Sequence, residues 1–259
     1  MTRFSANLGF LFQELSLPDA IRAAGAAGFD AVECHWPYVV DAAAVQAALA
    51  ASGLSMLGLN TARGDVAAGD NGLAALPGRE REAQAAIDQA LDYASRIGAS
   101  HVHVMAGKAS GPAAQGTFVR NLSEAAAKAA PLGLTLVIEP LNHFDAPGYF
   151  LSHTSHAEAV IAEVAAPNLK LMFDCYHVQI MEGDLSRSLS RLMPIIGHIQ
   201  IAAVPDRGEP GQGEVDYRHI CGLLHELGYT RPIGAEYKPR SSTLAGLGWL
   251  KELRHSAKT

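Results

Sequence analysis

Four polar residues in the second half of the chain each end or directly follow a short apolar run, and their spacing is regular. The runs are LTLVI before Glu139, LKLMF before Asp174, HI before Gln200 and PIGA before Glu236. Successive members are 35, 26 and 36 residues apart, and a (β/α)₈ barrel uses roughly 30 residues for each strand–helix unit. The spacing therefore predicts that each residue lies at or near the carboxyl end of a successive barrel strand, the rim where such folds carry their chemistry.

Three carboxylates and one amide oxygen at the same rim would repel one another unless a cation lay between them. Gln200 alternates with two isoleucines, so it points into the barrel, where a buried amide needs polar partners. Oxygen donors of this kind suit hard divalent ions, Mg²⁺ or Mn²⁺. The sequence therefore predicts one divalent metal ion held by Glu139, Asp174, Gln200 and Glu236.

Three residues beside these strand ends are candidates for substrate contact, and each has a plainer alternative. His177, one turn after Asp174, is either a donor to substrate, a partner of that carboxylate, or an ordinary loop histidine. Arg207, in a Gly/Pro-rich loop, is either a bidentate clamp for a substrate carboxylate or a solvated arginine. Lys238 follows Glu236 closely and is either an anion contact or a surface lysine.

Polar residues near the ends of the early strands are a weaker set of candidates. They either line the pocket or serve as hydrogen-bonded caps and loop anchors. They are Asn7, Glu33, His35 and Asn60.

Short β-like runs alternate with Ala-rich amphipathic segments along the whole chain. The expected strands are Phe4–Phe10, Ala31–Cys34, Met56–Asn60, His101–Met105, Leu134–Ile138, Leu169–Phe173, His198–Ala202 and Ile233–Glu236. The expected helices are Pro18–Ala27, Ala42–Ala51, Arg79–Ile97, Gln115–Ala130, Ser155–Val164, Leu185–Met193, Tyr217–Leu227 and Leu244–Leu253. Eight such pairs favour a closed parallel barrel, an α/β fold of the TIM type, in one domain spanning residues 1–259. A doubly wound open sheet is the alternative, but no GxGxxG or GxxxxGK turn is present.

Two long Gly-rich loops leave strand ends and are expected to shape the pocket. They are Thr61–Gly78 and Ala203–Asp216. Loops at this end of a barrel commonly cover the bound substrate.

Composition excludes several classes of protein. The chain of 259 residues has a formal net charge of −6 and no Lys/Arg cluster, which argues against nucleic acid as a partner. No apolar run reaches about 18 residues, and the polar N-terminus does not resemble a signal peptide, so no membrane partner is expected. Three cysteines without CxxC spacing are typical of a reduced, cytoplasmic protein. GxSxG, HExxH and zinc-type Cys/His clusters are all absent.

Longer motifs carry a resemblance to a known family. The segments EPLNHFD at 139–145, DCYH at 174–177 and RGEPGQGE at 207–214 resemble signatures of the xylose-isomerase-like sugar isomerases and epimerases. Further motifs are most similar to hydroxypyruvate isomerases: SANL at 5–8, LPGRE at 76–80, QIMEG at 179–183, GHIQI at 197–201, EYKP at 236–239 and AGLGW at 245–249. The segment NTARGD at 60–65 instead resembles the sister group, the 2-oxo-tetronate isomerases.

The resemblance implies roles for individual residues. It implies that Glu139 and Glu236 are the acid/base pair and that they share one divalent ion with Asp174 and Gln200. It places His177, Asp145 and Arg207 against the substrate. Gln200 stands where related ketose epimerases have histidine, which implies a harder, less zinc-like site. It further implies that copies of the chain form dimers or tetramers.

The implied activity is an isomerase of glyoxylate and carbohydrate metabolism. It would interconvert hydroxypyruvate and tartronate semialdehyde by moving one proton between adjacent carbons through an enediolate whose charge the metal stabilises. The partner would then be a small 2-oxo acid or sugar acid. The alternatives are a 2-oxo-tetronate isomerase, a ketose 3-epimerase, a barrel endonuclease for abasic DNA, and a non-catalytic sugar-acid binding protein.

Overall fold

Short runs of β-branched and aliphatic residues form the parallel strands of the protein, which is represented by a computed structural model that describes residues 1–255. All pairings between strands are parallel. The strands are β1 (Phe4–Asn7), β2 (Ala31–Glu33), β3 (Ser55–Met56), β4 (Gly58–Asn60), β5 (His101–His103), β6 (Thr135–Ile138), β7 (Leu169–Asp174), β8 (Ile196–Ile201) and β9 (Ile233–Ala235).

The order of the strands confirms the predicted TIM barrel. They neighbour one another as β3-β2-β1-β9-β8-β7-β6-β5-β4. The expected strand Met56–Asn60 is wrong in one respect, because Leu57 divides it into β3 and β4, which face different neighbours. Backbone hydrogen bonds from Cys34 N to Gly58 O (3.0 Å) and from Asn60 N to His35 O (2.8 Å) join this seam and close the ring.

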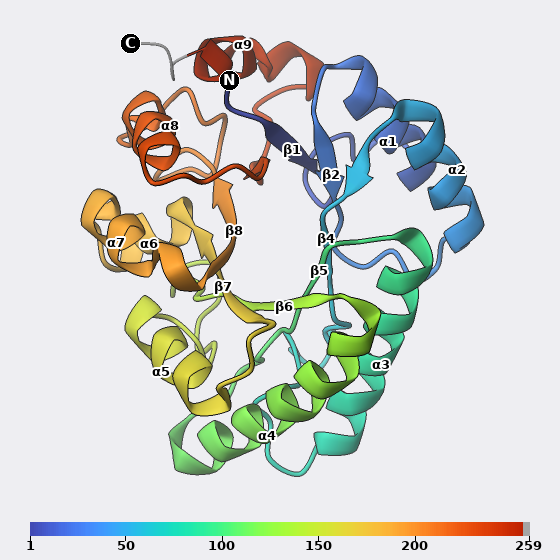
Figure 1. The fold of residues 1–259 in the computed structure, drawn as a ribbon, viewed down its shortest axis with the longest axis vertical. Helices are drawn as coiled ribbons and strands as arrows, with labels where there is room; N and C mark the ends of the chain where they lie inside the picture. Colours follow the sequence, from blue (N-terminus) through green and yellow to red (C-terminus); the bar gives the residue numbers. More distant parts are fainter. Residues whose placement is uncertain (256–259) are drawn as a thin grey trace.

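Nine helices within residues 1–255 surround the strands, as Figure 1 shows. They are α1 (Leu17–Ala26), α2 (Ala42–Ser52), α3 (Glu80–Ile97), α4 (Gly111–Ala129), α5 (Thr154–Val164), α6 (Cys175–Met181), α7 (Leu185–Leu192), α8 (Tyr217–Glu226) and α9 (Gly248–His255). Local signals explain several boundaries. The Ser16 and Asp216 side chains accept bonds from backbone N–H groups at the starts of α1 and α8, and Gly98 ends α3 at a φ of 68°.

Two helical predictions need correction. The sequence did not predict α6, because its seven residues are too few to show helical periodicity. The expected helix Leu244–Leu253 begins instead as a 3₁₀ turn, η3 (Leu244–Gly246), before α9. Two further 3₁₀ turns, η1 (Ala130–Leu132) and η2 (Met193–Ile195), follow α4 and α7.

The inside of the barrel is polar, whereas Val, Ile and Leu usually fill it. Buried Glu33 is hydrogen-bonded to both Ser5 and His198 across the interior. The His101 ring lies 4.8 Å from the His198 ring. The apolar residues of the strands therefore face mainly the surrounding helices, where they join one large core.

Glycines on two strands make room for these polar side chains. A β-carbon added at Gly58 would lie 2.1 Å from Nε2 of His101, and one added at Gly234 would lie 2.3 Å from Oε1 of Glu33. The polar side chains inside the barrel therefore require glycine at positions 58 and 234, because any β-carbon there would collide with them.

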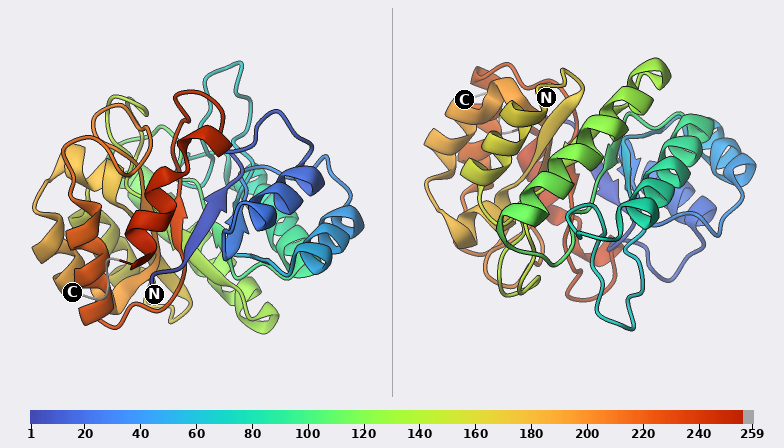
Figure 2. Two further views of the ribbon diagram at one scale, coloured as in Figure 1. Left: turned by 90° about the horizontal axis from the view of Figure 1, so that it is seen from above. Right: turned by 90° about the horizontal axis from the view of Figure 1, so that it is seen from below.

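Loops that leave the carboxyl ends of the strands project from one end of the barrel, and the loop after β4 extends furthest (Figure 2). The two ends of the described chain meet, because Thr2 N donates to Arg254 O (3.3 Å). None of the helices within residues 1–255 is long and apolar enough to cross a bilayer.

Gly58→Ala is expected to destabilise the protein by about 1–3 kcal/mol, because the new methyl group would collide with the buried His101 ring. Gly222→Ala is the matched control, since Gly222 lies within α8 and a methyl group added there would meet only open space. That change should stabilise by about 0.5–1 kcal/mol through helix propensity. Denaturant unfolding of both variants measures the difference, and equal stabilities would contradict the steric requirement.

Candidate metal and acid–base site

The four predicted oxygen donors lie at the ends of four neighbouring strands. Glu139 directly follows β6, Asp174 is the last residue of β7, Gln200 is the penultimate residue of β8, and Glu236 directly follows β9. All four are buried, with at most 6% of their surface exposed. Since the strands are parallel and adjacent, their ends lie side by side at one rim.

Three of these residues each present a buried oxygen that has no hydrogen-bond partner. The atoms are Glu139 Oε1, Asp174 Oδ2 and Gln200 Oε1. An unpaired buried oxygen is costly unless something satisfies it. Three such atoms from successive strands fit a hard divalent cation in both number and chemistry.

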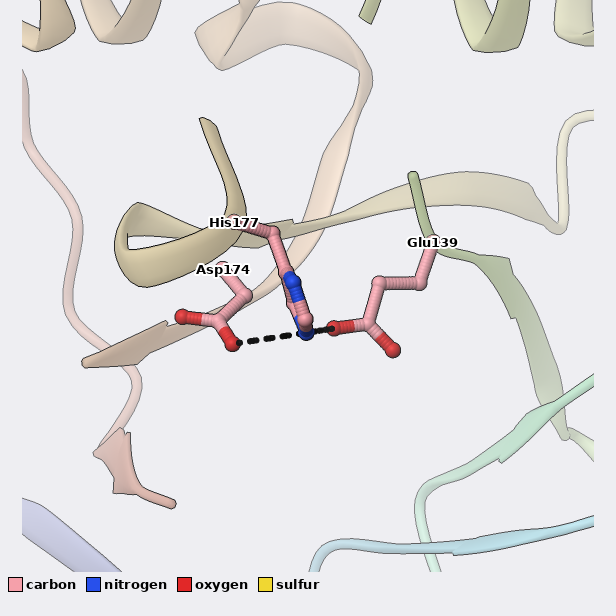
Figure 3. Close-up of side chains that lie close together, drawn as sticks. All are labelled: Glu139, Asp174 and His177. Carbon is pink, nitrogen blue, oxygen red and sulfur yellow. Dashed lines mark ion pairs between the residues drawn. The ribbon is translucent and has the colours of Figure 1, made fainter. Parts of the chain in front are cut away.

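Among residues 1–255, the side chains of Glu139, Asp174 and His177 form a group whose ligand atoms all lie within 4.8 Å of one another. Figure 3 shows the His177 ring directed between the two carboxylates. Its Nε2 lies 3.6 Å from Asp174 Oδ2 and 3.9 Å from Glu139 Oε1.

The tautomer of His177 makes it a donor to this site rather than a ligand. Its Nδ1 accepts the backbone N–H of Asn142 at 3.0 Å and faces the Asn142 amide nitrogen at 2.7 Å. The orientation of that amide is fixed, because its oxygen accepts the backbone N–H groups of Phe144 and Asp145. Burial lowers the pKa of His177 well below its usual value, so the ring is neutral and its single proton lies on Nε2.

A buried carboxylate on β2 orients Gln200. The amide nitrogen of Gln200 donates to Glu33 Oε2 at 2.8 Å, so the amide nitrogen is satisfied while the amide oxygen stays buried without a partner. Glu33 Oε1 accepts from Ser5 Oγ at 2.5 Å and lies 3.0 Å from His198 Nε2. Burial works to raise the pKa of Glu33, but His198 and Ser5 more than offset it and hold that pKa below its usual value.

Glu236 differs from the other donors because both of its oxygens are already hydrogen-bonded. Oε1 accepts from Asn7 Nδ2 at 2.8 Å and lies 3.0 Å from His35 Nε2, and Oε2 accepts from Arg207 Nη2 at 2.5 Å. Burial opposes its ionisation, but Arg207 and His35 hold the pKa of Glu236 at about 2. It is therefore ionised at neutral pH.

The other two carboxyl groups are shifted in the opposite direction. Burial, followed by the nearby Glu236 and Asp174, raises the pKa of Glu139 well above its usual value. Burial raises the pKa of Asp174 to about 7, although Arg207 opposes the shift. In the metal-free site the pKa values of the two glutamates are thus shifted in opposite directions, that of Glu139 upward and that of Glu236 downward, a division typical of an acid and a base working together.

Arg207 is the cation of the site, and three carboxylates surround it. Besides Glu236, its guanidinium lies 3.7 Å from Asp174 Oδ2 and 3.3 Å from Asp145 Oδ2. The rings of Phe10 and Tyr176 lie 4.8 and 4.9 Å from its Cζ atom. These contacts fix Arg207 above the strand ends rather than leaving it in solvent.

A cavity of about 150 Å³ opens over this group. Its lining includes the predicted residues Asn60, Glu139, Asp145, His177, Arg207 and Glu236. Asp174, Gln200 and Asn7 do not line the cavity, but the Asn7 side chain donates a hydrogen bond to Glu236, which does. The Lys238 side chain is exposed and lines no part of it, so its predicted contact with substrate stays a prediction.

Several cavity residues were not predicted. His103 is the last residue of β5, and its Nδ1 lies 3.6 Å from Glu139 Oε2. It is a polar residue at the end of a strand, so the signal that identified the four oxygen donors was present for His103 as well. Trp36 and Asn71 lie in loops, where no periodicity marks them. Hollows of about 400 and 320 Å³ open elsewhere, but none of the four predicted oxygen donors lines either one.

Known proteins are similar to this chain in sequence and in fold. Residues 21–253 match the family described as "Xylose isomerase-like TIM barrel". The chain is 49% identical over 97% of its length to the 2-oxo-tetronate isomerase of Cupriavidus necator, covering 98% of that protein. It is 39% identical over 98% of its length to the hydroxypyruvate isomerase of Escherichia coli, covering all of that protein. A crystal structure titled AP endonuclease, family 2, from Brucella melitensis matches with a TM-score of 0.94 and 40% identity, over 97% of this chain and 99% of that one.

Asp174→Asn is expected to gain stability relative to wild type as pH rises. Between about pH 4 and 7 the unfolded chain ionises Asp174 while the folded, metal-free protein keeps the proton, so wild type loses up to about 1.4 kcal/mol per pH unit. The amide cannot ionise, so the variant is spared this loss. Unfolding free energies measured with chelator should therefore diverge between about pH 4 and 7.

Asp92→Asn removes an exposed carboxylate from α3 and serves as the control. Its pH profile measures the effect of removing a carboxylate that lies outside the site in an exposed position. A difference between Asp174→Asn and wild type that stays constant with pH would contradict the raised pKa.

Proposed function

The chain belongs to the xylose isomerase-like TIM-barrel family, and we propose that it is a metal-dependent isomerase of small 2-oxo acids. That it is an isomerase of this family follows from relatives that match over nearly its whole length. The finer proposal rests mainly on one observation: Glu139 and Glu236, with opposite pKa shifts, lie at the same rim as three unpaired buried oxygens, one of which belongs to Glu139.

The proposed reaction interconverts hydroxypyruvate and tartronate semialdehyde. One proton leaves carbon 3 and one is added at carbon 2, while the carbonyl and the hydroxyl exchange places, so no oxidant or reductant is needed. The difficult step is removal of a proton next to a carbonyl group. A divalent ion, Mg²⁺ or Mn²⁺, held by Glu139, Asp174, Gln200 and Glu236 would stabilise the negative charge that develops on the two substrate oxygens.

The side chains of this site divide the remaining work. Glu236, held ionised by Arg207 and His35, is suited to accept a proton from carbon. Glu139, whose pKa burial and the nearby carboxyl groups raise, is the candidate to return one on the neighbouring carbon. His177 directs its Nε2 proton into the same space and is suited to donate a hydrogen bond to a substrate oxygen.

The main alternative is the same reaction on a longer substrate. A four-carbon 2-oxo acid has the same 2-oxo-3-hydroxy unit with one further CH₂OH group, and relatives at 38–49% identity carry the name 2-oxo-tetronate isomerase. A ketose 3-epimerase would use the same proton chemistry on a longer sugar. Solved 3-epimerases share the fold, with TM-scores of 0.76–0.81, but at 17–22% identity they support the fold alone.

The rival functions from other classes are less well supported. An abasic-site endonuclease must bind a polyanion, whereas this chain has a net charge of −6 and carboxyl groups around its cavity. A non-catalytic binding protein would have no use for two glutamates whose pKa values are shifted in opposite directions. Cytoplasmic residence and self-association stay predictions; the three buried, free cysteines agree with a reducing compartment.

Glu139→Gln and Glu236→Gln are each expected to lower kcat by about 10²–10⁴-fold, because each removes one proton-transfer group. Proton NMR in D₂O should follow both the conversion of hydroxypyruvate and the entry of deuterium from solvent. Glu163→Gln, on the outer helix α5, controls for the loss of a carboxylate elsewhere. Full activity in either folded site variant would overturn the assignment of the acid/base pair.

Removal of the metal is expected to abolish turnover and to lower the thermal stability. Chelator-treated protein should regain both when Mg²⁺ or Mn²⁺ is added, since an ion that binds only the folded state stabilises it. Gln200→Leu removes one of the three unpaired oxygens and should bind Mn²⁺ more weakly in a calorimetric titration. Turnover that persists at full rate in excess chelator would exclude a metal-dependent mechanism.

A further inference from the structure

The positive charge of Arg207 is already balanced by carboxylates of the site. Its guanidinium contacts Glu236, Asp174 and Asp145 at 2.5–3.7 Å. Of the described residues that line the cavity, it alone is an arginine or lysine. An acidic substrate would therefore enter a cavity rich in carboxyl groups, where the charge of Arg207 is already neutralised. The carboxylate of the substrate would need another positively charged partner.

Arg63 is a second guanidinium close to this cavity, and its hydrogen-bonding capacity is unused. It lies three residues after the end of β4 and is half-buried. Its Cζ atom stacks 3.9 Å from the centroid of the Trp36 ring, which lines the cavity. Within residues 1–255 its side chain makes no hydrogen bond or ion pair, although most other arginines here are paired with a carboxylate or carbonyl group.

The backbone around Arg63 is held firmly. Gly72 N donates to Arg63 O at 2.9 Å, and Trp36 Nε1 donates to Thr61 O at 3.1 Å. Asn60 and Asn71, on either side of Arg63 in the sequence, both line the cavity. The loop therefore fixes the base of the arginine next to the opening.

Stacking on an indole ring restrains a guanidinium while leaving its in-plane N–H groups available for a carboxylate. We propose that Arg63, stacked on Trp36, binds the carboxylate of an acidic substrate at the mouth of the cavity, while Arg207 serves the site's own carboxylates. The inference rests on the proposed isomerase function and refines it, because it makes 2-oxo acids, rather than neutral ketoses, the preferred substrate class.

The test compares an acidic substrate with its neutral analogue. Hydroxypyruvate and dihydroxyacetone share the HOCH₂–CO– unit and differ in having –COO⁻ or –CH₂OH beside it. Arg63→Ala is expected to raise KM for hydroxypyruvate by about 10- to 100-fold, the range for a lost charge-assisted hydrogen bond, with little change in kcat. The effect on isomerisation of dihydroxyacetone should be much smaller, and Arg63→Lys should restore part of the affinity for the acid.

Lys108→Ala is the matched control, because Lys108 is an exposed cation beside the same loop and does not line the cavity. A KM raised equally by Lys108→Ala would mean general electrostatic attraction and would overturn the assignment to Arg63. An unchanged KM in Arg63→Ala, with wild type active on hydroxypyruvate, would overturn it as well but leave the isomerase intact. A wild-type protein that turns over no 2-oxo acid with Mg²⁺ or Mn²⁺ would overturn both.

Discussion

Repulsion among buried carboxyl groups is the constraint around which this barrel is organised. Glu139, Asp174 and Glu236 converge from neighbouring strands, and Arg207 is the one guanidinium within residues 1–255 in direct contact with the group. They cannot all be ionised there without a further cation. The three carboxyl groups differ in their hydrogen bonding. Glu236 has three polar partners, whereas Glu139 and Asp174 each keep one unpaired oxygen. That inequality separates an acid from a base on one rim.

The polar interior extends this arrangement downward into the barrel. Glu33 connects Gln200 at the rim with His198 and Ser5 below it, so an oxygen at the site is oriented from deep within the barrel. A buried network of this kind defines one geometry but adds little hydrophobic stabilisation. The contacts between the outer faces of the strands and the helices must therefore supply most of the stability.

The sequence predicted the barrel and its rim because both follow from periodicity. Residues at the ends of consecutive parallel strands must meet at one edge, so the positions of Glu139, Asp174, Gln200 and Glu236 could be predicted from spacing alone. What spacing cannot specify is which oxygens are already satisfied. Glu236 is paired with Asn7, which is 229 residues away in the chain, and that pairing depends on closure of the ring, which local patterns do not encode. The helix α6 has only seven residues, too few to show a helical period.

The two tryptophans of this chain lie in contrasting environments. Trp36 forms part of the cavity wall and lies close to both the Arg63 guanidinium and the His35 ring. Trp249 is buried against Phe4 and Tyr237, where the last helix covers the barrel. The protein thus carries two intrinsic fluorophores in different places. A ligand that enters the cavity would change the emission of Trp36 but leave that of Trp249, whereas unfolding would change both.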